Sequence, residues 1–147
     1  MKAYNKGLLI CAGITFAITI TGIVFFLLSY GTGYIGIVYG EKNSLWITAF
    51  LIAVIVIYIL LFLGTSKFKM REEICNVLTY VLVVLFTLCI VLLLADRVDA
   101  IGNCIVAPWD AGHGGEDSCY LSFVSMGCWF AAMAGNMAVS FIGYRKK

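Results

Sequence analysis

Four long apolar runs restrict what this chain can fold into more than any other feature. They extend over residues 8–30, 44–64, 76–95 and 120–144, and none contains Asp, Glu, Lys or Arg. A helix rises about 1.5 Å per residue, so about 20 residues cross a hydrocarbon core roughly 30 Å thick. Barrel strands would instead alternate over about 10 residues, and these runs do not alternate. The sequence therefore predicts an all-α integral membrane protein, a four-helix transmembrane bundle.

The composition supports the same class. Of 147 residues, 63% are hydrophobic and only 12% are charged, and the mean hydropathy is +1.02. A soluble domain carries about 25% charged residues. No linker-like stretch interrupts the chain, so we expect a single domain over residues 1–147. No basic segment indicates nucleic-acid binding. We expect the lipid bilayer to surround most of the protein.

The distribution of charge predicts the orientation. One set of charged residues lies at the two chain ends and between the second and third runs: Lys2, Lys6, Lys67, Lys69, Arg71, Glu72, Glu73, Arg145, Lys146 and Lys147. The other set is mostly acidic: Glu41, Lys42, Asp96, Arg97, Asp99, Asp110, Glu116 and Asp117. Short cytoplasmic loops are rich in Lys and Arg. We therefore expect a protein of the plasma membrane with both termini in the cytoplasm. We expect the first run to be retained as a signal anchor.

Residues 96–119 form a polar segment that we expect to be a long outward-facing loop. Cys104 and Cys119 are the only cysteines in the predicted outward regions. Cysteines on an oxidising face of a membrane usually pair. Closing a loop of about 15 residues stabilises a fold by about 3 kcal/mol in the chain-entropy model. The sequence thus predicts a structural disulfide between these two residues.

The same segment contains a weak candidate metal site. Asp110, His113, Glu116 and Asp117 lie close together in a Gly-rich stretch. Carboxylates and imidazole can bind a divalent cation. Their spacing matches no zinc-protease, EF-hand or zinc-finger pattern, so we expect a solvated acidic loop without a metal or another cofactor.

Small residues in the first and last runs predict where helices pack. Gly127, Ala131 and Gly135 recur every four residues in the last run, and Gly13 and Ala17 do so in the first. Such spacing lets transmembrane helices approach closely.

Asn136 lies beside the small residues of the last run. An amide facing lipid is costly, so we expect this side chain to face protein or a polar cavity. Structural hydrogen bonding is the expected role, and lining a ligand path is the alternative.

These observations leave two classes of non-enzymatic function open. The first is an accessory subunit that packs against another membrane protein or another copy through the last helix, and contacts a partner through the outer loop. The second is part of an oligomeric channel or small-solute transporter whose outer mouth is formed by Asp96, Arg97 and Asp99. No run contains an ionised residue, which disfavours proton-coupled transport by this chain alone.

A third function follows from a resemblance in layout. Four helices, cytoplasmic termini and two cysteines in the second outer loop, Cys104 and Cys119, resemble the DsbB-type thiol oxidases of bacteria. The resemblance implies disulfide exchange, but that family also carries a CxxC pair in its first outer loop. Residues 31–43 contain no cysteine, so electrons lack a relay. We therefore expect no enzymatic activity.

Overall fold

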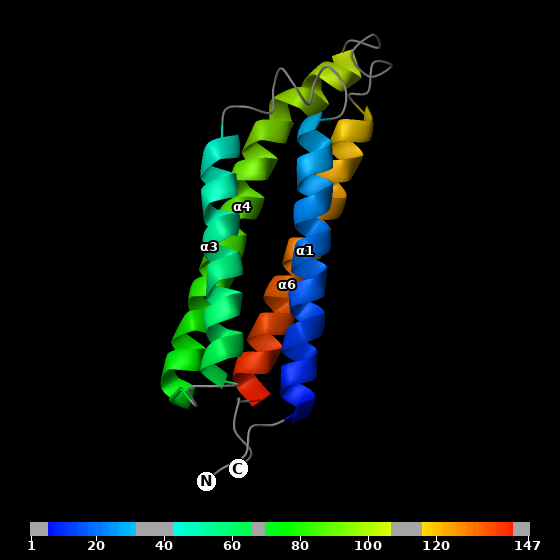
Figure 1. Cartoon of the computed structure of the whole chain (residues 1–147). Coiled ribbons are helices and arrows are strands. Elements are labelled where there is room, and N and C mark those ends of the chain that lie inside the picture. The colour runs from blue at the N-terminus through cyan, green and yellow to red at the C-terminus, as the bar shows by residue number, and fades with distance from the viewer. Residues whose placement is uncertain (1–5, 32–42, 66–69, 107–115, 143–147) are drawn as a thin grey trace.

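Four helices make up the part of the chain that the structure describes. The computed structural model describes residues 6–31, 43–65, 70–106 and 116–142. The helices are α1 (Lys6–Gly31), α3 (Ser44–Leu63), α4 (Glu72–Val106) and α6 (Glu116–Ile142) (Figure 1). Each contains a segment long and apolar enough to cross a membrane. The described residues contain no strand.

The helices run alternately up and down along one bundle. Helix α6 packs most extensively on α1, then on α4, and α4 packs on α3. Helices α1 and α3 share very few direct contacts within the described residues. The first residues of α1 and the last residues of α6 lie at the same end of the bundle, beside the end of α3 and the start of α4 (Figure 1). This end is called the lower end below, and the opposite one the upper end.

A tight contact between α1 and α6 holds the centre of the bundle together. Trp129 of α6 is fully buried, and its ring lies 5.6 Å from the ring of Phe26 in α1. A Cβ added to Gly22 would approach the Trp129 ring to 2.7 Å. Glycine is therefore required at position 22 for the two helices to pack at this distance, because a methyl group has no room.

Helix α4 corrects one sequence-based prediction. The third run was expected to end at Ala95 and to be followed by a loop over 96–119, but the helix continues to Val106 and α6 begins at Glu116. Residues 98–106 contain no proline, and the charged Asp96 and Arg97 find partners on neighbouring helices, as described below. Neither residue forces the helix to end. The extension projects beyond the other helices at the upper end (Figure 1).

Candidate functional site

Polar side chains from three segments meet around Asp96 at the upper end of the bundle. Asp96 is only 5% exposed. Its Oδ2 accepts hydrogen bonds from the Tyr30 hydroxyl at 3.0 Å and from the Asn43 backbone N–H at 3.2 Å. Its Oδ1 accepts one from Asn43 Nδ2 at 2.6 Å. One carboxylate thus joins α1, α4 and the residue that precedes α3.

Arg97 is the second charged member of this group and is 1% exposed. Its Nε donates to Ser122 Oγ at 2.8 Å, and its Nη2 donates to the backbone O and the Oγ of Ser29 at 3.4 and 3.3 Å. The guanidinium carbon lies 4.8 Å from the centre of the Tyr30 ring. A cation over an aromatic face is stabilised by the ring quadrupole. Nη1 has no hydrogen-bond partner among the described residues.

Serines on one face of α6 extend the group along α1. Ser118 donates to the backbone O of Ser29 at 2.6 Å, and Ser125 donates to the backbone O of Gly22 at 2.8 Å. Ser122 accepts from Arg97 and donates to the backbone O of Ser118 at 2.9 Å. We call the whole set the Asp96–Arg97 cluster; its members are Ser29, Tyr30, Asn43, Asp96, Arg97, Ser118 and Ser122.

This arrangement is suited to holding helices together rather than to chemistry. The carboxylate of Asp96 already accepts three hydrogen bonds, and both charged side chains are buried. Asp96 and Arg97 were expected at an outer mouth, but both side chains are buried and bond to residues of α1 and α6. The side chain of Asp99 lies outside the described residues.

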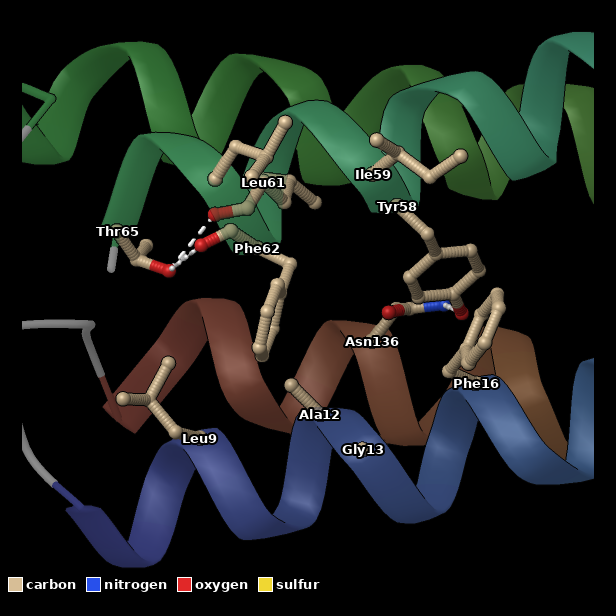
Figure 2. Close-up of a pocket in the computed structure, with 11 residues that line it drawn as sticks. Leu9, Ala12, Gly13, Phe16, Tyr58, Ile59, Leu61, Phe62, Thr65 and Asn136 are labelled. Carbon is tan, nitrogen blue, oxygen red and sulfur yellow. Dashed lines mark hydrogen bonds between the residues drawn. The ribbon is translucent and has the colours of Figure 1, made fainter. Parts of the chain in front are cut away.

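A cavity of about 350 Å³ lies between α1 and α3, near the lower end of the bundle. Figure 2 shows Leu9 and Thr65 at one end of it and Phe16, Tyr58 and Asn136 at the other. Its lining comes from α1, from α3 and one residue just beyond it, and from one residue of α6: Leu9, Ala12, Gly13, Phe16, Tyr58, Ile59, Leu61, Phe62, Leu63, Thr65 and Asn136. No charged side chain is among them. We call this space the α1–α3 cavity.

A short polar chain forms the inner end of the α1–α3 cavity. Asn136 is 2% exposed, and its Nδ2 donates to the Tyr58 hydroxyl at 2.7 Å. The Tyr58 oxygen lies 3.4 Å from Thr19 Oγ1, and the Tyr58 ring meets the Phe16 ring edge-on at 5.2 Å. The amide nitrogen of Asn136 faces Tyr58 and its oxygen lies on the opposite side (Figure 2). No described residue donates a hydrogen bond to that oxygen.

The small residues singled out in the sequence have different surroundings. Gly13 lines the α1–α3 cavity, and Ala17 is exposed. Gly135 faces α1, where an added Cβ would lie 2.9 Å from Thr15 Oγ1. Gly127 and Ala131, in contrast, are exposed. Within one chain, the stripe is therefore split between a buried contact and an open surface.

Several predicted residues of the outer loop lie outside the described residues, namely Asp110, His113 and the side chain of Cys104. Glu116 and Asp117 are exposed in the first turn of α6, and Cys119 is buried. No disulfide joins two side chains that the structure describes, and the Cys104–Cys119 bond stays a prediction. The described residues also contain no group of three metal-ligating side chains.

Sequence reasoning did not single out Ser29, Ser118, Ser122, Gly22 or Tyr58. The serines of α6 could have been recognised as a polar stripe, because Ser118, Ser122 and Ser125 follow one another at spacings of four and three residues. The groups on α1 that accept their hydrogen bonds could not be predicted from the sequence. Comparison of the chain with protein-family models, with curated proteins and with solved structures finds no match.

Proposed function

We propose that the chain is a non-enzymatic multi-pass membrane protein of the cell membrane that acts as an interaction subunit and docks through α6. Insertion is supported by the four apolar helices. The start of α1 and the end of α6 share one end of the bundle with the end of α3 and the start of α4. In the sequence, the basic residues Lys67, Lys69 and Arg71 lie between α3 and α4, which supports cytoplasmic termini by the positive-inside rule.

The exposed face of α6 is the observation that carries this proposal. Gly127, Ala131, Ala134 and Ala138 are all exposed and recur at four, three and four residues. We call these four residues the α6 seam. A Cβ added to Gly127 would meet nothing within 4 Å, so the seam is open in the single chain.

The α6 seam has the features of a helix-packing surface. Small residues at this spacing let a second helix approach closely, and the repeat of about 3.5 residues suits a left-handed crossing. Bulky side chains lie along one side of the seam, since Phe123, Phe130 and Met137 are also exposed. The occupant is a transmembrane helix of another copy or of a different membrane protein.

The test substitutes two residues of the α6 seam in the full-length protein. Gly127→Leu and Ala131→Leu each place a branched side chain where the partner helix would lie. The matched control is Ala49→Leu, at an exposed position of α3. In mild detergent, we expect the wild type and the control to elute with the mass of an assembly, and both seam variants to elute as a single folded chain. An unchanged assembly in the seam variants, or a wild type that is monomeric and partnerless, contradicts the proposal.

A further inference from the structure

We propose that the α1–α3 cavity binds an uncharged, lipid-like molecule that carries a hydroxyl group. In this arrangement the apolar body lies between Phe16 and Phe62, and the hydroxyl donates a hydrogen bond to Asn136 Oδ1. The inference rests on the proposed membrane insertion but not on the α6 seam, which faces away from α1 and α3.

The lining of the cavity selects against charge. The described residues that line it are apolar apart from Tyr58, Thr65 and Asn136, and none of these residues is ionised. Transfer of a charged group into such surroundings without a counter-ion is strongly unfavourable. A phosphate, a carboxylate or an ammonium group therefore does not fit this space.

The need for a hydrogen-bond donor follows from Asn136. Its side chain is almost completely buried, its Nδ2 is engaged by Tyr58, and its Oδ1 receives no hydrogen bond from the described residues. This oxygen borders the cavity, so a donor on a bound molecule can reach it. The hydroxyl of Thr65 donates to the backbone O of Leu61 at 2.7 Å, so it has no proton left for a ligand and can only accept. Thr65 lies at the far end of the cavity, and an O–H group that reaches the inner end meets Asn136 Oδ1 as its acceptor.

The volume sets the size of the ligand. An engineered cavity of about 150 Å³ holds benzene, so about 350 Å³ corresponds to on the order of fourteen non-hydrogen atoms. That is the lower part of the range of natural ligand sites. A medium-chain alcohol such as 1-dodecanol matches both this size and the single donor.

Access is from the side of the bundle. Helices α1 and α3 share very few contacts, and two residues that line the cavity, Ile59 and Phe62, are also exposed at 49% and 67%. In an inserted protein these exposed side chains face the hydrocarbon region. The ligand therefore comes from the bilayer, which concentrates uncharged amphiphiles, rather than from water.

Photolabelling tests the site directly. The full-length protein in lipid nanodiscs is irradiated with a diazirine analogue of 1-dodecanol, and labelled residues are mapped by mass spectrometry. We expect labels on Phe16 and Phe62, and excess 1-dodecanol should compete about tenfold better than dodecane, as one hydrogen bond predicts. Labels spread evenly over exposed residues of all four helices overturn the proposal. Equal competition by dodecane overturns the recognition of a hydroxyl.

Two variants separate the space from the acceptor. Gly13→Leu fills open space, since a Cβ there meets nothing within 4 Å, and Gly31→Leu is the matched control because it has the same freedom at the other end of α1. We expect at least tenfold weaker labelling of Phe16 and Phe62 in Gly13→Leu and no change in the control. Asn136→Leu should keep labelling but lose the preference for the alcohol.

Folding and insertion are checked independently. Flotation with liposomes reports insertion, so a failed label is not mistaken for a failed insertion. If Asn136→Leu does not fold, Tyr58→Phe replaces it as a probe: it removes the partner of Nδ2 but leaves Oδ1 in place. The alcohol preference is then expected to persist, and its loss in Tyr58→Phe contradicts the assignment to Oδ1.

Discussion

The two ends of the bundle use similar polar side chains for opposite purposes. At the upper end, one carboxylate receives three donors and the guanidinium of Arg97 is enclosed by hydroxyls and an aromatic ring. At the lower end, the Asn136 amide has a partner for its nitrogen but, among the described residues, none for its oxygen, and it borders the α1–α3 cavity. Both ends contain a tyrosine whose hydroxyl bonds to α4 or α6. The difference is in how many donors and acceptors the neighbouring helices supply.

That difference assigns separate roles to the two ends. A buried polar group that is fully satisfied adds rigidity, whereas one that is partly satisfied is a place where a ligand gains binding energy. At the upper end, the carboxylate of Asp96 with its three donors therefore fixes how α1, α4 and Asn43 meet, whereas Arg97 Nη1 has no partner among the described residues. At the lower end, Asn136 leaves an acceptor beside the α1–α3 cavity for an added molecule. Substitutions at matched positions of the two ends test whether their roles differ in this way.

The largest effect is expected at Asp96. Asp96→Leu removes the acceptor of three hydrogen bonds and leaves the half-buried donors of Tyr30 and Asn43 without that partner. Hydrogen bonds to charged groups contribute about 1.5–3 kcal/mol each in water-soluble proteins and less in bilayers. We expect a loss of about 3 kcal/mol in the free energy of unfolding, measured in mixed micelles. Asp117→Leu, at an exposed position of α6, is the control and should change it by no more than about 0.5 kcal/mol.

Gly22, which lies between the two ends, should give the next largest effect. Gly22→Ala brings a methyl group to 2.7 Å from the Trp129 ring and 3.0 Å from Cys128 Cβ. Overpacking of this kind costs about 1–3 kcal/mol, and we expect about 2 kcal/mol in the same unfolding assay. Gly127→Ala has free space and a better helix former, so its stability should stay equal or rise. Equal stability of both variants would show that α1 and α6 do not pack as described.

The sequence was sufficient for the helices but not for their ends. Four apolar runs without charge correspond to four helices. The prediction that α4 stops at Ala95 was wrong, because it treated the first charged residues as the end of the helix. Asp96 and Arg97 are instead buried against residues far away in sequence, Tyr30 and Ser122. Such partners depend on how the helices are arranged and are not visible in the local sequence.

The sequence predicted only part of the exposed small-residue stripe of α6, for a geometric reason. A helix has 3.6 residues per turn, so each four-residue step rotates by about 40°. Two steps take Gly135 about 80° away from Gly127, far enough to turn it toward Thr15 of α1 while Gly127 stays exposed. Ala134 takes its place on the exposed face. The α1–α3 cavity could not be predicted from the sequence, since it depends on the distance between two helices.

The smallest effects come from making one change at both ends. Tyr30→Phe removes a hydrogen bond to the carboxylate of Asp96 at 3.0 Å, whereas Tyr58→Phe removes one from the neutral amide of Asn136 at 2.7 Å. A charged partner roughly doubles the strength of a hydrogen bond, and membrane-helix hydrogen bonds average about 0.6 kcal/mol. We expect losses of about 1.2 kcal/mol for Tyr30→Phe and about 0.6 kcal/mol for Tyr58→Phe in the unfolding assay. Both variants keep their rings, so the cation–π contact of Arg97 and the packing of Phe16 are matched. A larger loss at Tyr58 than at Tyr30 would mean that the lower end, and not the Asp96–Arg97 cluster, holds the bundle together.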